Sequence, residues 1–398
     1  MMTPTKITRR DAIKTGAALT AAAALPIETI AYADDPPKPA PKPPLFIHAY
    51  TDRMSYAPGE EVKVHLSTNA EKCMIITDFE SLEDDKRGET PIVPGKDFPI
   101  PEDASSHGCR WPVAIKYTIP HNTKSGYYRI KVIAPNAPSL LQRANCDIVL
   151  AETFFVVRPK EPGKNSKILL QLSTNTYNAY TNWGGYSLYA YNGKHKVQGR
   201  RVSFDRPITS QFDRWEKHFV EWAEKAGYKL DYCVNSDLEF RPELLNYYKL
   251  VLSVGHDEYW SAPMRDNLEK YIGDGGNVAF FSGNTCCWQV RSEDNGRALA
   301  CWKQSFGDDP SYKSGNHKLL TSLWSHYLVG RPENSLTGVG FPWGGYHRSH
   351  GQFMDGSGAY SAHRPDHWLL SGTNLKRGDT FGAKLPGYKV VGYECDGC

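Results

Sequence analysis

The sequence has no dense block of basic residues beyond its first 33 positions. Removing residues 1–33 takes away four basic and two acidic side chains, so the formal charge at pH 7 falls from +3 to +1. Binding to nucleic acid depends on clustered Lys and Arg side chains that neutralise phosphates. We therefore predict that nucleic acid is not a partner of this protein.

Zinc-type cysteine pairs and long apolar runs are also missing. The nine cysteines are scattered, and only Cys395 and Cys398, at the C-terminus, have the Cys-x-x-Cys spacing. The longest mild apolar run, residues 15–25, is too short and too weakly apolar to cross a membrane. We predict neither a zinc site of the Cys-x-x-Cys kind nor a membrane span.

Residues 1–33 have the pattern of an export signal. A pair of arginines at positions 9 and 10 precedes the apolar run, and Ala-Tyr-Ala at 31–33 has the small-x-small form of a cleavage site. The paired arginines favour the twin-arginine route over an ordinary Sec signal. We therefore predict a periplasmic or secreted protein, in which disulfides are permitted but their pairing is left open.

The remainder of the chain divides by pattern into a linker, an all-β part and an α/β part. Residues 34–44 are a Pro-rich linker. Residues 45–160 show alternating strand patterns with turns and no helical periodicity, which predicts an Ig-like β-sandwich without catalytic groups. In residues 166–398 buried-type strands alternate with helices, which predicts a doubly wound parallel sheet of flavodoxin or glutamine amidotransferase type.

Three unusual segments follow the predicted strands 167–172, 249–254 and 277–281. They read TYNAYTNWGGYSLYAYN, GHDEYWS and SGNTCCWQVR. Ligands of such sheets bind at the carboxyl ends of the strands. We therefore expect Tyr177, His256, Glu258 and Asn284 to lie on one rim of the sheet, with His256 and Asn284 as catalytic candidates.

The GHDEYWS segment brings ionisable groups to a strand end. His256 and Glu258 are two positions apart, so in an extended segment they point to the same side. Glu258 would ligate a metal while His256 acts as a base or as a donor behind the ligand. The alternative is that Asp257 and Glu258 merely precede a helix whose N-terminus favours acidic groups.

The Tyr-rich segment and the Cys-Cys turn are the other chemical candidates. Phenolate and carboxylate oxygens together suit ferric iron, whereas the alternative role of the tyrosines is aromatic packing. Cys286 sits in a tight turn after a strand, as a nucleophile would, although the alternative is a small buried thiol. The five tyrosines of the segment are Tyr177, Tyr180, Tyr186, Tyr189 and Tyr191.

Four segments, LSTNTYNAYTNWGGYSLY, SFDRP, LVLSVGHDEYWS and GGNVAFFSGNTCCWQVR, resemble the C-terminal domain of the N,N-dimethylformamidase large (beta) subunit family in order and spacing. The resemblance covers residues 166–398. It implies an amidohydrolase that cleaves a small amide at mononuclear ferric iron, which acts as a Lewis acid. The iron is held by two tyrosines and one glutamate, with a histidine close by.

Matched residue by residue, the resemblance implies a ligand set in this chain. Glu258 and His256 match the glutamate and the histidine, with His256 carrying the proton to the departing amine. The first tyrosine matches Tyr177, with Tyr180 as the alternative, and the second matches Tyr189, with Tyr186 and Tyr191 as competitors. The implied partners are a small amide substrate and either a second copy of the chain or a small accessory subunit.

Two other functions remain open on the sequence. One is an exported, non-catalytic binding module that uses the aromatic loop, and the other is a cysteine hydrolase or amidotransferase at Cys286. The chain also stops soon after a predicted strand at 388–393. Because family members are expected to continue there, the interpretation is either a truncated chain or an unusual variant of the family.

Overall fold

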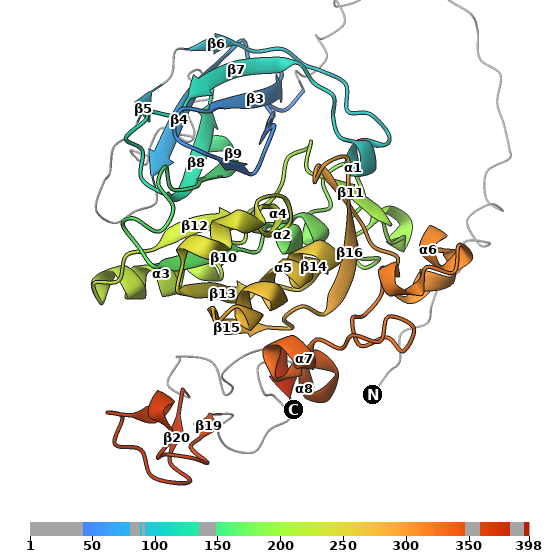
Figure 1. Ribbon diagram of the computed structural model, residues 1–398. Helices are drawn as coiled ribbons and strands as arrows, with labels where there is room; N and C mark the ends of the chain where they lie inside the picture. The colour runs from blue at the N-terminus through green and yellow to red at the C-terminus, as the bar shows by residue number, and fades with distance from the viewer. Residues whose placement is uncertain are drawn as a thin grey trace, which may run out of the picture. The chain divides into compact units, whose positions relative to one another are not determined.

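The computed structural model describes residues 43–79, 88–89, 92–134, 149–346, 359–382 and 394–397 (Figure 1). The export signal, most of the linker and the strand expected at 388–393 lie outside the described residues. What is described is a mixed α/β protein with several sheets, one of them parallel.

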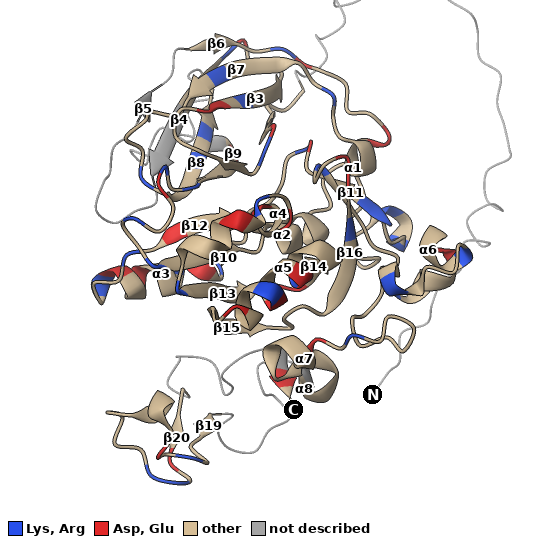
Figure 2. Cartoon of the chain, in the orientation of Figure 1, with Lys and Arg blue, Asp and Glu red and all other residues tan. Residues whose placement is uncertain are grey.

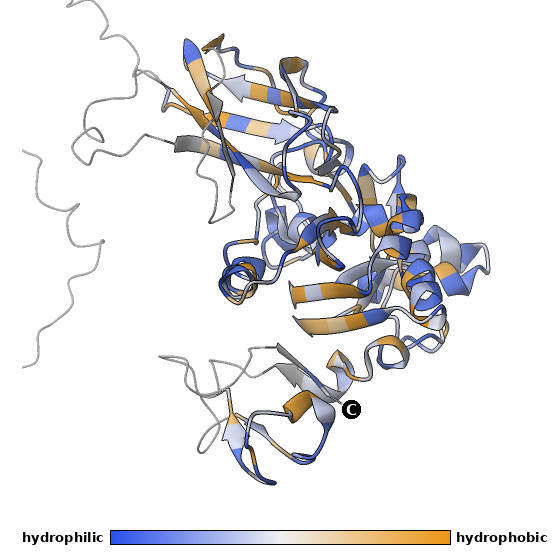
Figure 3. Cartoon of the chain, turned by 60° about the vertical axis from the view of Figure 1, so that its left-hand side comes forward, coloured by the Kyte–Doolittle hydropathy of each residue, from blue (hydrophilic) through white to orange (hydrophobic). Residues whose placement is uncertain are grey.

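The first part of the chain forms two mainly antiparallel sheets, because its strands alternate apolar and polar residues (Figure 3). In one strand, for example, Val62, Val64 and Leu66 are buried while the residues between them are half-buried. The first sheet has the order β1 (Ile47–Thr51), β3 (Glu61–Thr68), β7 (Val113–Thr118). The second has the order β2 (Ser55–Tyr56), β9 (Val149–Val157), β8 (Gly126–Ile133), β4 (Lys72–Phe79), β5 (Gly88–Glu89), with β6 (Val93–Pro94) also paired to β4. A short helix, α1 (Ala104–His107), precedes β7.

The second part is built on a four-stranded sheet whose neighbours are all parallel. Its order is β12 (Asp231–Val234), β10 (Ile168–Leu172), β13 (Leu250–His256), β15 (Asn277–Gly283). The strands alternate along the chain with α2 (Thr174–Tyr180), α3 (Glu216–Lys225), α4 (Asn235–Phe240), the 3₁₀ turn η3 (Pro242–Tyr247) and α5 (Ala262–Gly273). The continuous apolar runs of the sequence had predicted such buried parallel strands, and this prediction is confirmed.

Helices α5 and α3 differ in how well the local sequence accounts for them. Helix α5 begins as expected, since Ser261 Oγ accepts the Met264 N–H at 3.3 Å and a proline stands in the first turn. Helix α3 begins at Glu216, and its buried face carries Glu216, Val220 and Ala223. Trp222 on the same helix is 56% exposed.

A second four-stranded sheet is built from strands that alternate along the chain with those of the parallel sheet or follow them. Its order is β11 (Arg201–Ser203), β17 (Ala298–Ala300), β16 (Trp288–Glu293), β14 (Tyr259–Ser261), and β14 pairs with β16 in parallel. The short elements of the rest of the described chain are η2 (Lys194–Lys196), η4 (Lys303–Asp308), α6 (Pro310–Lys313), η5 (His317–Leu319), α7 (Asn334–Thr337), α8 (Phe341–Gly344) and η7 (Trp368–Leu370), with strand pairs β18 (Gly345–Tyr346) to β21 (Glu394–Gly397) and β19 (Tyr360–Ser361) to β20 (Thr380–Phe381).

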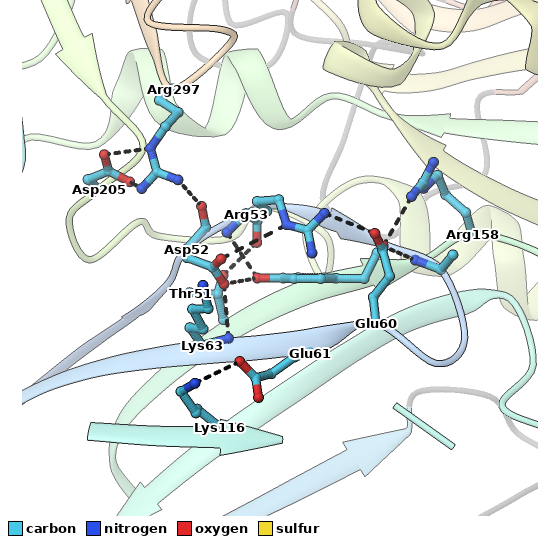
Figure 4. A network of polar contacts seen from close by, with 12 residues as sticks. Thr51, Asp52, Arg53, Glu60, Glu61, Lys63, Lys116, Arg158, Asp205 and Arg297 are labelled. Atoms are coloured by element: carbon cyan, nitrogen blue, oxygen red, sulfur yellow. Dashed lines mark hydrogen bonds and ion pairs between the residues drawn. The ribbon is translucent and has the colours of Figure 1, made fainter. Parts of the chain in front are cut away.

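One face of the β8–β9 pair shares a hydrophobic core with the parallel sheet, and the two antiparallel sheets enclose a separate core between them. The chain from Leu45 onward is one compact unit. The ring of Tyr127 on β8 stacks on Phe212 with centroids 4.1 Å apart. Polar contacts add to this junction (Figure 4): Arg297 binds the Asp205 carboxylate and donates to the Asp52 carbonyl at 2.7 Å.

The Tyr127 hydroxyl supports a modest stability prediction at this junction. It donates to Ser210 Oγ at 2.8 Å in a half-buried setting. Tyr127→Phe keeps the stacked ring and removes this bond, so we expect the free energy of unfolding to fall by about 1 kcal/mol. Urea denaturation measures it, with Tyr128→Phe as the control, because the Tyr128 hydroxyl makes its bond to the Lys124 carbonyl at the surface. An equal loss in both variants would contradict the prediction.

Candidate functional site

The three unusual segments meet at the carboxyl ends of β10, β13 and β15. The parallel register pairs His256 at the end of β13 with Gly283 at the end of β15. The segments that follow are bonded to one another: Glu258 N–H donates to Thr176 Oγ1 at 3.0 Å, and Trp288 N–H donates to the Glu258 carbonyl at 3.0 Å. The three segments therefore meet at one rim of the parallel sheet, as its topology predicted.

Glu258 lies at the centre of this rim and is only 2% exposed. The phenol of Tyr180 donates to its Oε2 at 2.8 Å, and the phenol of Tyr189 lies 2.8 Å from both carboxylate oxygens. The indole N–H of Trp288 donates to Oε1 at 2.8 Å, and His256 Nε2 lies 3.7 Å from Oε2. A buried carboxylate is thus held by three donors with an imidazole beside it.

The intervening Asp257 points to the opposite side, as strand alternation requires. Its carboxylate accepts from Gln171 Nε2 at 2.9 Å, Ser253 Oγ at 2.9 Å and Asn235 Nδ2 at 3.1 Å. Burial raises the pKa of this carboxyl group. Glu258 itself precedes strand β14 and not a helix, so the local geometry does not support a mere helix-dipole role for it.

The structure brings Tyr180 and Tyr189 together, and it places Tyr177 elsewhere. Tyr177 is fully buried in the shared core, edge-on to Phe154 at 5.9 Å. Burial and then the neighbouring charge of Glu216 raise the pKa of its phenol well above the usual value. Burial and then the charge of Glu258 likewise raise the pKa of the Tyr189 phenol well above its usual value.

The two remaining tyrosines of the segment lie further out. Tyr191 is 70% exposed, with its ring 5.4 Å from that of Tyr189. Tyr186 is half-buried, and its carbonyl accepts a bond from Arg206 at 3.1 Å. Of the five phenols, those at 180 and 189 are the two that hydrogen-bond Glu258 in the described part of the chain.

Lys303 is a site residue that the sequence reasoning missed. It is 3% exposed, and its Nζ lies 3.4 Å from the ring centroid of Tyr189, 4.8 Å from Trp288 and 5.1 Å from Tyr259. Burial lowers the pKa of its ammonium group, against the opposing effect of the Glu258 charge. The only local signal for it was a lysine directly after the apolar residues 298–302.

Asn284 and Cys286 occupy the turn after β15. Both adopt positive φ, +54° and +52°, in the left-handed region that few side chains favour. Asn284 is 2% exposed, and its side-chain Oδ1 has no hydrogen-bond partner within the described chain. Cys286 is fully buried, and burial raises the pKa of its thiol, so the reactive thiolate is disfavoured.

Arg206, from the SFDRP segment, holds the tyrosine loop in place. It is fully buried, and its Nη2 donates to the Asn178 side chain at 3.0 Å and to the Thr181 carbonyl at 2.9 Å. Its other bonds reach the carbonyls of Asn178, Trp183, Tyr186 and Ser203. One guanidinium therefore fixes the end of α2 and the loop that leads to Tyr189.

Charge elsewhere does not suggest a second functional face. Basic and acidic segments are interspersed along the elements that the structure describes (Figure 2). Among the same described residues, no group of three or more His, Cys, Asp or Glu side chains is arranged so that it could hold a metal ion. None of the described helices has the length and apolar character needed to span a membrane.

Comparison with known proteins identifies relatives of the chain. A family model described as N,N-dimethylformamidase beta subunit-like, C-terminal, matches residues 81–398. A twin-arginine translocation signal model matches residues 6–26, which confirms the predicted export to the periplasm by that route. The family match begins upstream of residue 166, where the resemblance was expected to start.

Two curated relatives are N,N-dimethylformamidase beta subunits. The one from Alcaligenes sp is 26% identical over 228 residues, and the one from Paracoccus aminophilus is 27% identical over 229. Each alignment covers 46% of this chain and 28% of the relative, so the match spans under a third of the relatives' length. The solved structure of a Bacillus subtilis sporulation control protein, Spo0M, aligns over 30% of this chain and 51% of its own, at 12% identity and a TM-score of 0.16.

Proposed function

Because the chain belongs to the N,N-dimethylformamidase beta subunit-like family, we propose that it is an exported, iron-dependent amidohydrolase acting on a small amide C–N bond. The observation that carries the proposal is the convergence of Tyr180 and Tyr189 on the single buried carboxylate of Glu258, with His256 alongside.

The donor set fits mononuclear ferric iron. Two phenol oxygens and a carboxylate are hard ligands, and their three negative charges would balance a trivalent ion. Tyr180, Tyr189 and Glu258 would hold the ion, which takes the place of the phenol protons now shared with Glu258. Tyr180 is preferred here to the alternative Tyr177, whose phenol lies in the core. When bound, the iron supplies a Lewis acid for the amide carbonyl.

The chain's own residues supply positioning and proton transfer. Water adds to the carbonyl carbon, the C–N bond breaks, and the amine leaves with a proton that His256 delivers. Trp288 fixes Glu258 through its indole N–H, and the rings of Tyr259 and Trp288 help to exclude water. Lys303 places its amino group against the rings of Tyr189 and Trp288, and the unpaired Asn284 Oδ1 is available to a substrate N–H.

Two other functions fit the geometry less well. A binding module with an aromatic loop would present its rings to solvent, whereas Tyr180 and Tyr189 turn inward to Glu258 and only the outer Tyr191 is largely exposed. A cysteine hydrolase would need an accessible thiolate, and Cys286 is fully buried.

The finer architecture also belongs to this proposal. We assign residues 45–160 to an Ig-like sandwich and residues 166–398 to a flavodoxin or glutamine amidotransferase-like domain, in line with the sheets described above. Both curated relatives are named as subunits, which is compatible with a homo-oligomer or a small accessory subunit. A small amide remains the proposed substrate class.

Phenylalanine substitutions test the ligand set. In protein expressed with ample iron, we expect Tyr180→Phe and Tyr189→Phe each to weaken iron binding by more than about 10- to 100-fold, the usual loss for a residue that only supports a ligand. Both should also diminish the visible phenolate-to-iron absorbance. Tyr177→Phe is the matched control and should keep iron and colour.

Metal analysis, visible spectra and hydrolysis of a panel of small N-alkylated amides supply the readouts. Retention of iron and colour in Tyr180→Phe together with their loss in Tyr177→Phe would return the ligand role to Tyr177. A wild type that binds no iron would refute the iron-dependent amidase and favour the binding module.

A further inference from the structure

The C-terminal strand β21 returns to the turn that carries Asn284. Asp396 Oδ1 accepts the backbone N–H of Asn284 at 2.8 Å, and Oδ2 accepts the backbone N–H of Thr285 at 3.0 Å. The strand is anchored by pairing with β18 and by a bridge between Gly397 and Gly340. The Asp396 carboxylate, more than a hundred residues downstream of Asn284, therefore accepts hydrogen bonds from two successive backbone amides of the turn after β15.

These two hydrogen bonds fall on a stretch of backbone with an uncommon conformation. Asn284, at φ +54°, lies in the left-handed region, which asparagine adopts more readily than most residues, and the two bonds to Asp396 hold the backbone in that conformation. Bonds from backbone amides to a carboxylate are charge-assisted and stronger than neutral ones. Inside the turn, Thr285 Oγ1 bonds Ser282 Oγ at 3.0 Å, and Ser282 Oγ accepts the Asp257 N–H at 3.2 Å, next to Glu258.

With its backbone held in this way, the turn fixes the position of the Asn284 side chain. Asn284 directly follows Gly283, whose backbone pairs with that of His256 in the parallel register, so the turn begins at the same strand ends as the imidazole. Its Oδ1 is buried and without a partner in the described chain. A buried amide oxygen is normally satisfied, which points to a ligand as its partner.

We propose that Asp396 is a positioning residue that acts through Asn284, holding its amide toward the substrate. The inference rests on the proposed amidase function. The competing explanation is that Asp396 only stabilises the fold of the C-terminal segment. The two differ in a measurable way, because a residue that acts through Asn284 has no effect on catalysis once Asn284 is gone.

A double-mutant cycle with Asn284→Ala is the decisive experiment. We expect Asp396→Asn, which replaces one acceptor oxygen by a donor, to lower kcat/KM for small amides by about 10- to 100-fold. The same change in the Asn284→Ala background should lower it no further. Iron content and the visible band should stay at wild-type levels, and Asp396→Glu should recover part of the activity.

Asp379→Asn is the matched control, since Asp379 accepts the Lys376 N–H at 2.8 Å in an exposed turn of its own segment. It should behave as wild type. Wild-type kcat/KM in Asp396→Asn, or an undiminished effect in the Asn284→Ala background, would overturn the positioning role. Amide hydrogen exchange at Asn284 and Thr285 should quicken in Asp396→Asn, and unchanged exchange would overturn the contact itself. An inactive, iron-free wild type is a different result, because it refutes the proposed function.

Discussion

Glu258→Gln is expected to abolish iron binding and to lower amide hydrolysis by at least about 100-fold, beyond the usual loss for a residue that only supports a ligand. The change keeps the size of the side chain but removes the negative charge on which both phenols converge. A neutral amide is a poor ligand for ferric iron, and its NH₂ group would oppose the Trp288 indole N–H or a phenol donor.

Glu239→Gln is the matched control for this substitution. Glu239 Oε2 accepts the hydroxyls of Ser261 and Ser292 at 2.6 and 2.5 Å, so it is another carboxylate with two hydroxyl donors, outside the site. We expect it to keep its iron and its activity. Metal content and kcat/KM on one amide panel give the comparison. Full iron occupancy in Glu258→Gln would exclude Glu258 as a ligand.

Arg206→Met is expected to lower the free energy of unfolding by at least about 3 kcal/mol. The substitution leaves several buried carbonyls of the tyrosine loop without a donor, and each such group costs about 1–3 kcal/mol. Burial lowers the pKa of this guanidinium to about 9, so it is still charged at neutral pH. Arg206→Lys should also destabilise, because one ammonium cannot reach all of these acceptors.

Urea denaturation at constant m-value measures the loss. Arg200→Met is the control, because Arg200 is 42% exposed in its side chain and pairs with Asp308 at 3.0 Å at the surface. An exposed pair of this kind contributes up to about 1 kcal/mol. Equal midpoints for the Arg206 and Arg200 variants would show that the buried guanidinium does not organise the loop.

The local sequence pattern was sufficient for those structural features that depend only on residues close together in the chain. Apolar runs predicted the buried parallel strands, and Ser261 followed by a proline predicted the start of α5. The two-residue spacing of His256 and Glu258 predicted a shared side, which the 3.7 Å separation confirms. These features depend on backbone periodicity and capping, which are written in consecutive residues.

The choice between Tyr177 and Tyr180 could not be made in this way. Residues three apart on a helix share a face, so their spacing is compatible with either phenol at the site. The packing of α2 decides, because it buries Tyr177 near Glu216 and leaves Tyr180, at the helix end, against Glu258. Which role each tyrosine plays in catalysis stays a prediction.

By itself, then, the sequence determined the export signal, the family, the parallel strands and the rim on which His256 and Glu258 stand. Only the tertiary structure decided which side chains surround Glu258. Trp288 reaches Glu258 and Lys303 reaches the ring of Tyr189 from separate later segments, and Asp396 reaches the neighbouring turn from the last described strand. The physical reason is that these contacts join residues far apart in the chain, which no local periodicity records, and that a buried Arg206 or Lys303 reads in sequence like any surface cation.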